Sequence, residues 1–282
     1  MYKFYIVAGR TQEHGEIWCY DPNAGDDGRG RWSFVTQNND WAMFRRGAVG
    51  LYDGKIFLAS GTSNGKFASY DIEGDTWTTY GAVSPNIDQC GATVCNGKFY
   101  IAGGRNGATA IYECDLTNPN GGFIQVGTLP VGVAYPTVVN YNGIVYILCG
   151  RLADGNPSGE VQTYNPSTGE THDLTAESPA GQAPVQVPIQ GWAKNGCVDP
   201  ATGMLYIGGG GQSGDPEWAV VNPPWIKCNI TQLRADMFDH SMATDVSNFP
   251  YEDWKSTGTM VSGRVTANGF GVPNAVVGFK TD

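Results

Sequence analysis

The sequence predicts an all-β fold with many tight turns, and its composition supplies the evidence. Forty of the 282 residues are glycine, roughly twice the usual share of about 7%. Because glycine costs about 1 kcal/mol in a helix interior, a helix-rich fold is disfavoured. Charged residues make up only 16% of the chain and aromatic residues 12%, which is not the composition of a disordered protein. The glycines also lack the three-residue period of collagen.

Charge and hydropathy exclude two classes of partner. The formal net charge is −10, so phosphate backbones should repel the chain and no nucleic-acid partner is expected. No apolar run approaches the roughly 20 residues of a membrane-spanning helix. Residues 1–9 lack the long apolar core of a signal peptide and are typical of a strand. We therefore expect a cytoplasmic protein or one assembled into a particle such as a virion.

Cysteine usage indicates neither a disulfide framework nor a zinc site. The chain has seven cysteines, an odd number, and none of them forms a CxxC pair. Most lie in apolar runs such as residues 144–149. Reduced thiols packed in the core are the expected state.

An internal repeat organises the chain. Its first phrase is a β run that ends in a small residue and a glycine. The second phrase ends in Asp or Asn, whose side chain can start a turn by bonding to the backbone two residues on. The copies of the first phrase are 3–9, 55–61, 98–104, 144–150 and 204–210, and those of the second are 18–22, 68–71, 112–115, 162–166 and 219–223.

Two further strands complete each unit. A small-residue strand precedes the first phrase and ends in Asp-Gly or Asn-Gly, as in 47–54, 91–97 and 135–143. These dipeptides favour type I′ hairpin turns, which need positive φ at both central residues. After the second phrase an aromatic residue opens a fourth strand; these residues are Trp32, Trp77, Phe123 and Trp254, with His172 near this place in the fourth copy.

Four short antiparallel strands thus recur in roughly 45 residues, and the unit resembles the kelch repeat. The phrases that carry the resemblance are Gly-Gly after one strand, Tyr-Asp-Pro after the next, and then Trp. They cover about residues 1–225 and resume near Trp254, although only two copies keep the full double glycine. The resemblance implies a β-propeller, in which four-stranded blades surround a central channel.

The two ends of the chain favour a closed ring in a single domain, 1–282. The chain starts with the second strand of a blade, and residues 268–279 look like the missing innermost strand. Pairing between them would leave no free edge. In a closed ring, the stretch that runs from Gly210 to the C-terminus and then from the N-terminus to Gly9 is too long for one plain blade and slightly short for two. We favour five blades, with an insertion at about 226–253 that includes a helical turn near 232–238, and six blades are the alternative.

A cationic rim is the candidate binding site. Arginine follows the phrase glycine in three units, and blade symmetry would bring the three to one face. Arginine suits bidentate binding of a carboxylate, so the ligand could be an acidic peptide, a sialic-type sugar or another carboxylate. Alternatively, these arginines form salt bridges or cap carbonyls. The predicted rim residues are Arg10, His14, Arg45, Arg46, Arg105 and Arg151.

No arrangement typical of catalysis stands out. The histidines are scattered, and the glycine phrases end in turns between strands, not at a helix N-terminus. No GxSxG elbow or spaced Asp-x-Asp calcium loop occurs, so no catalytic residue, metal or cofactor is predicted. Four carboxylates in the rim loops of the fourth and fifth blades could pair with Arg151 or bind calcium: Asp154, Glu160, Asp215 and Glu217. Trp41, Trp192 and Trp218 could stack on sugars or pack between blades.

Three functions remain open. The favoured one is a non-catalytic propeller that binds protein or glycan as an accessory, structural or adhesion component of a larger assembly, with a virion tail or fibre protein among the options. The first alternative is an epimerase or lyase that acts on an acidic sugar at the arginine-lined rim. It would need a base within hydrogen-bonding reach of the arginines. The second is an intracellular adaptor that captures acidic peptides.

Overall fold

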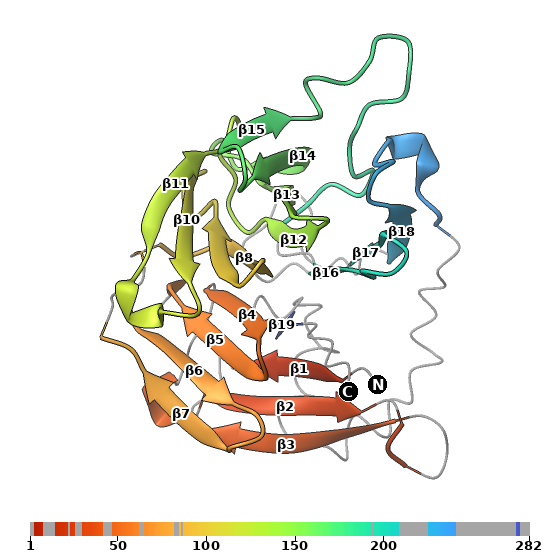
Figure 1. Ribbon diagram of the computed structural model, residues 1–282. Helices are drawn as coiled ribbons and strands as arrows, with labels where there is room; N and C mark the ends of the chain where they lie inside the picture. The colour runs from red at the N-terminus through yellow and green to blue at the C-terminus, as the bar shows by residue number, and fades with distance from the viewer. Residues whose placement is uncertain are drawn as a thin grey trace.

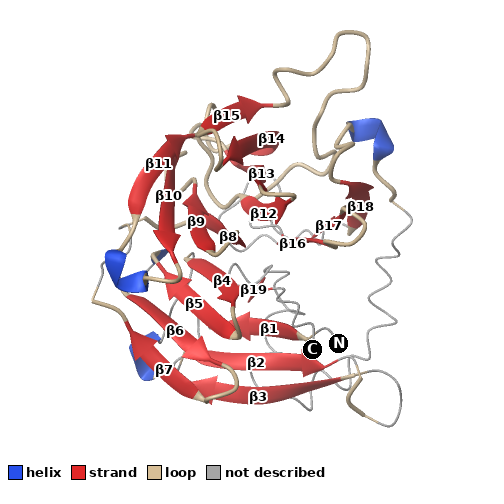
Figure 2. Ribbon diagram, viewed as in Figure 1, coloured by secondary structure: helices blue, strands red, loops and turns tan. Residues whose placement is uncertain are grey.

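The structure is all-β, as the composition predicted. The computed structural model describes residues 3–7, 15–21, 23–25, 30–41, 47–61, 65–81, 85, 87–192, 195–208, 225–240 and 275–276. Strands dominate this part of the chain, and the helical segments in it are short 3-10 turns (Figure 2). None of the helices described is long and apolar enough to cross a membrane.

Small antiparallel sheets stand around a common centre like the blades of a propeller (Figure 1). Four of them have four strands and one has three. The first contains β19 (Ala275–Val276), β1 (Phe4–Val7), β2 (Glu16–Asp21) and β3 (Arg31–Gln37), and the second β4 (Ala48–Tyr52), β5 (Lys55–Ala59), β6 (Phe67–Asp71) and β7 (Thr76–Thr79). The third contains β8 (Gly91–Cys95), β9 (Lys98–Ala102), β10 (Ala110–Asp115) and β11 (Ile124–Thr128). The fourth contains β12 (Thr137–Tyr141), β13 (Ile144–Arg151), β14 (Pro157–Asn165) and β15 (Glu170–Asp173), and the fifth β16 (Asn195–Val198), β17 (Met204–Gly208) and β18 (Ile226–Asn229).

The first sheet joins the two ends of the chain. Strand β19 pairs antiparallel with β1, with Tyr5 opposite Val276. A segment near the C-terminus thus provides the innermost strand of the first sheet, as the sequence predicted. Residues 209–224 and 241–274, which include the fifth copy of the second phrase and Trp254, lie outside the described residues. The five-blade count and the closure of the ring therefore stay predictions.

The start of the expected insertion at 226–253 belongs to the fifth sheet. Ile226–Asn229 form β18, which pairs with β17. Ile226 and Cys228 are buried against the fourth sheet, and this apolar contact explains why these residues form a strand. A 3-10 turn at Ala235–Met237 follows, within the segment where the sequence predicted a helical turn.

The hairpin dipeptides adopt the predicted backbone. Asp53 and Gly54 have φ of 47° and 70°, as a type I′ turn requires. Both residues of the pairs at 96–97 and 142–143 also have positive φ. These turns connect the two inner strands of the second, third and fourth sheets.

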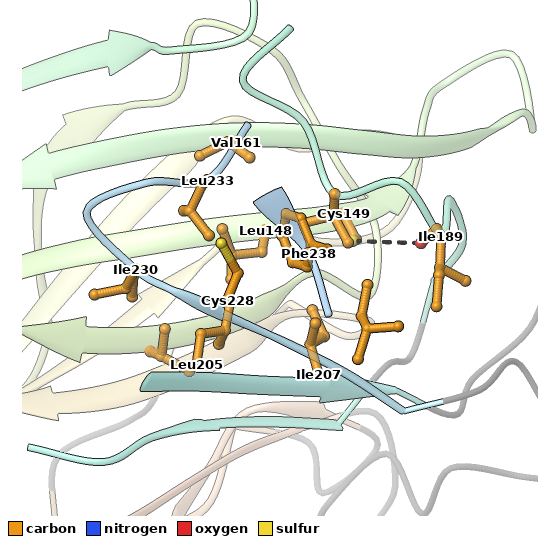
Figure 3. Close-up of a cluster of buried hydrophobic side chains, with 13 residues drawn as sticks. Leu148, Cys149, Val161, Ile189, Leu205, Ile207, Cys228, Ile230, Leu233 and Phe238 are labelled. Carbon is orange, nitrogen blue, oxygen red and sulfur yellow. Dashed lines mark hydrogen bonds between the residues drawn. The ribbon is translucent and has the colours of Figure 1, made fainter. Parts of the chain in front are cut away.

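The hydrophobic core lies between neighbouring sheets. Figure 3 shows the layer between the fourth and fifth sheets, where Leu148 and Val161 lie in one cluster with Leu205 and Ile207. Comparable buried clusters join the first sheet to the second, the second to the third, and the third to the fourth. All seven cysteines are free thiols, and all but the half-buried Cys197 are buried.

The strand-end glycines join one sheet to the next. The backbone N–H groups of Gly61, Gly104 and Gly150 donate to carbonyls in the loops that lead into the following sheets, at 2.7, 2.9 and 2.8 Å. A side chain would obstruct this approach, because a Cβ added at Gly103 would lie 2.4 Å from the carbonyl oxygen of Val133. Glycine in the repeat therefore serves contact between blades as well as turns.

Candidate ligand-binding rim

Two kinds of loop form the candidate rim: the loop after the second strand of a sheet and the loop that leads into the innermost strand. They come together through the glycine hydrogen bonds. Arg105 and Arg151 are the predicted rim residues that the structure describes. The other four, Arg10, His14, Arg45 and Arg46, lie outside the described residues.

Arg105 is neutralised by a carboxylate. Its Nε and Nη2 donate to Oδ1 and Oδ2 of Asp88 at 2.8 and 2.5 Å, the two-pronged geometry that arginine favours. Its backbone N–H also donates to the Asp88 carbonyl at 2.8 Å. The hydrogen bonds that Arg105 donates to Asp88 raise the pKa of its guanidinium above the ordinary value. Because Asp88 lies in the loop into β8, the pair ties together two loops of one sheet.

Arg151 is held by aromatic rings instead. Its guanidinium carbon lies 6.0 Å from the ring centroid of Tyr135 and 5.8 Å from that of Trp192, within the range of cation–π contacts. Both rings are buried and belong to one small cluster with Ala134. Two backbone hydrogen bonds of 2.8 Å between Arg151 and Ala134 fix the end of β13.

This aromatic support spans two sheets. Tyr135 precedes β12 of the fourth sheet, whereas Trp192 precedes β16 of the fifth. In the part of the chain that the structure describes, no carboxylate forms an ion pair with Arg151. Its hydrogen-bonding edge therefore has no acidic partner among those residues.

Two of the four carboxylates that the sequence offered to Arg151 have other surroundings, and the other two, Asp215 and Glu217, lie outside the described residues. Asp154 accepts hydrogen bonds from the backbone N–H and side-chain Nδ2 of Asn156 at 2.9 and 2.8 Å, and these bonds lower the pKa of its carboxyl. Oε2 of Glu160 is buried without a hydrogen-bond partner. Desolvation, and then the charge of Asp173, raise the pKa of Glu160.

Sequence reasoning missed two residues of this region. Gln89 and Tyr135 stand in the loops just before β8 and β12, and both have left-handed backbone, with φ of 62° and 54°. Aligning the repeats at the residue before each innermost strand could have found them. Trp41 and Trp192 are 1% and 7% exposed, so both pack inside the protein, while Trp218 lies outside the described residues.

The described residues do not assemble a metal site. No three His, Cys, Asp or Glu side chains within them come close enough to hold a metal ion. The rim in this part of the molecule offers instead one arginine on aromatic rings, one arginine paired with a carboxylate, and the nearly buried amide of Gln89.

Comparisons with known proteins agree with the geometry. No family model matches the chain. Over 110 residues it is 29% identical to Kelch-like protein 35 of Mus musculus, a match that covers 37% of this chain and 17% of that protein. It also resembles the solved structure of YjhT, with a TM-score of 0.55 and 15% identity over 73% of this chain and 72% of the other. The fold is a β-propeller. The match to a kelch-like protein agrees with the resemblance seen in the repeat phrases.

Proposed function

We propose that this kelch-type propeller is a non-catalytic module whose rim binds a carboxylate-bearing protein or glycan. The observation that carries the proposal is Arg151, which rests on Tyr135 and Trp192 without an acidic partner among the described residues. Its planar fork of N–H donors matches a carboxylate. The rings restrict the side chain, so less conformational entropy is lost when a ligand binds.

Arg105 has a secondary place in this proposal. Its N–H donors already serve Asp88, and a ligand would have to share them. The remaining predicted rim residues, Arg10, His14, Arg45 and Arg46, would extend the cationic surface around the rim.

We further propose that binding serves an accessory, structural or adhesion role in a larger assembly such as a virion tail or fibre. The support is indirect and comes from how the chain uses its residues. The repeat glycines build turns and contacts between sheets, and the sequence offers no arrangement typical of catalysis. A stoichiometric copy number in purified particles would be the expected result of a proteomic measurement. Its absence from every particle fraction would contradict this role.

A glycan array and an acidic-peptide library test the binding role, with Arg151→Gln as the variant and Arg105→Gln as the matched control. Loss of charge-assisted hydrogen bonds should weaken binding about tenfold or more in Arg151→Gln. Arg105→Gln should have a smaller effect, because Asp88 already occupies that guanidinium. Unchanged binding by Arg151→Gln would refute the site, and turnover of a sugar acid would replace the binding role with an enzyme.

A further inference from the structure

The side chain of Gln89 is unusual for a residue that serves only the fold. It is 3% exposed, and its Oε1 atom is buried without a hydrogen-bond partner. An unpaired buried amide oxygen is costly, and an apolar side chain of similar size would avoid that cost. The left-handed backbone of Gln89 is shared by Tyr135 at the equivalent position of the next sheet, so it belongs to the repeat. The unpaired amide oxygen is particular to Gln89 and requires an explanation of its own.

Gln89 belongs to the same part of the rim as Arg151. Its carbonyl accepts a hydrogen bond from the backbone N–H of Tyr135 at 2.5 Å. The ring of that tyrosine lies 6.0 Å from the Arg151 guanidinium carbon. The neighbouring Asp88 holds Arg105. Gln89, through its backbone carbonyl, and Arg151, through its guanidinium, thus both contact Tyr135.

We propose that the Gln89 amide accepts a hydrogen bond from the ligand that Arg151 holds, and that this ligand is a small hydroxylated carboxylic acid, as sugar acids are. The inference rests on the proposed function and names its ligand class. An amide oxygen can only accept, so the ligand must bring a hydrogen-bond donor in addition to its carboxylate, and the hydroxyls of a sugar acid are such donors. The terminal torsion of glutamine is soft, and the amide can turn toward a ligand while the backbone stays in place.

Selectivity follows from the same chemistry. A site with an unpaired buried polar group disfavours a ligand that leaves the group unpaired. Arg151 would supply attraction for any carboxylate, and Gln89 would distinguish a hydroxylated acid from a plain one. Tyr135 and Trp192 fix the position of the guanidinium between them.

The test compares D-glucuronate with cyclohexanecarboxylate, two six-membered-ring acids that differ in their hydroxyl groups, by nuclear magnetic resonance titration. The wild-type protein should prefer glucuronate. Gln89→Leu should bind glucuronate about tenfold more weakly and cyclohexanecarboxylate as before. Arg151→Gln should weaken binding of both acids. Gln89→Met, which keeps an unbranched side chain, serves as a second variant if the leucine form does not fold.

Thermal unfolding adds a readout that a structural glutamine would not give. Gln89→Leu should raise the melting temperature, because it removes an unpaired buried oxygen. The control is Gln162→Leu, since Gln162 is fully buried and its amide exchanges hydrogen bonds of 2.8 and 2.9 Å with the Val131 backbone. That variant should lower the melting temperature.

The outcomes separate the two proposals. If the wild type binds both acids and Gln89→Leu keeps the same preference for glucuronate, the role of Gln89 is refuted, while the rim survives provided that Arg151→Gln loses binding. If the wild type binds neither acid, the ligand class is refuted. Binding of acidic peptides in the library screen, with loss in Arg151→Gln, would then still support the proposed function. A lower melting temperature in Gln89→Leu would also count against the inference, because it would show that the glutamine stabilises the fold.

Discussion

The third and fourth sheets have the same repeat, but their charged side chains have different partners. Each is a four-stranded antiparallel sheet whose second strand leads to a glycine followed by arginine. In the third sheet the charges are paired. Arg105 is held by Asp88, and Glu113 accepts hydrogen bonds from Lys98 Nζ and Tyr100 Oη at 2.5 and 2.7 Å.

In the fourth sheet two charged groups have different surroundings. Arg151 lies against aromatic rings, and Oε2 of Glu160 is buried without a hydrogen bond. The repeat therefore determines backbone geometry and contacts between sheets, and leaves the electrostatics of each blade to individual residues. Buried polar groups without partners require an explanation, which is why the rim near the fourth sheet is the stronger candidate for binding.

Removing the Trp192 ring, which lies against Arg151, should have the largest effect on stability. Trp192 is 7% exposed and forms part of the buried cluster with Ala134 and Tyr135. Trp192→Ala should lower the free energy of unfolding by about 3–5 kcal/mol, because it opens a cavity in a packed layer. Urea denaturation measures the change.

Trp192→Phe is the matched control for that prediction. It keeps an aromatic face beside Arg151 and should cost much less. If Trp192→Ala unfolds at the wild-type urea concentration, the ring does not support this end of the fourth and fifth sheets, and the contrast between the two arginines loses its structural basis.

The paired carboxylate of the third sheet gives the next largest effect. Glu113→Leu leaves the hydroxyl of Tyr100, a residue 1% exposed, without its partner. The variant should lose about 1–3 kcal/mol of unfolding free energy. The double variant Glu113→Leu with Tyr100→Phe should recover part of that loss, because both polar groups are then gone. Equal losses in the single and double variants would show that the pairing contributes little.

The sequence was sufficient to predict the repeated backbone. Asp-Gly and Asn-Gly fix hairpins through local φ preferences, so dipeptides such as Asp53-Gly54 could be placed without any tertiary information. The pairing of β19 with β1 followed from the missing strand in the first unit. The sequence did not predict strand β18 and assigned its residues to an insertion. These residues carry no repeat phrase, and their burial depends on contact with the fourth sheet.

The site was predictable only in part. Register in the repeat put Arg105 and Arg151 at equivalent strand ends, but it could not show that Asp88 pairs with one and Trp192 lies against the other. Those contacts depend on loops of different length and composition. The sequence also could not predict the unpaired oxygen of Gln89, because that depends on whether the folded chain places a hydrogen-bond donor beside the side chain.

The smallest effect is expected at Glu160, whose raised pKa makes it dependent on pH. Desolvation and the nearby Asp173 favour the protonated form in the folded state. The folded protein therefore holds this proton more tightly than the unfolded chain does. Stability should fall as pH rises from the unfolded pKa of glutamate through the raised folded value, and stay lower above it.

Glu160→Gln removes that fall, because the amide stays neutral at every pH. The variant should match the wild type near pH 3, where glutamate is protonated in both states, and exceed it at pH 7. Urea denaturation at the two pH values measures the difference. Glu170→Gln on β15 is the control, because Glu170 is exposed and surface changes usually stay within about 0.5 kcal/mol. A variant that is less stable than the wild type at pH 7 would mean that the contacts of the Glu160 carboxyl group with Thr175 and Asp173 outweigh the cost of its desolvation. The contrast between the third and fourth sheets would then rest on Arg151 alone.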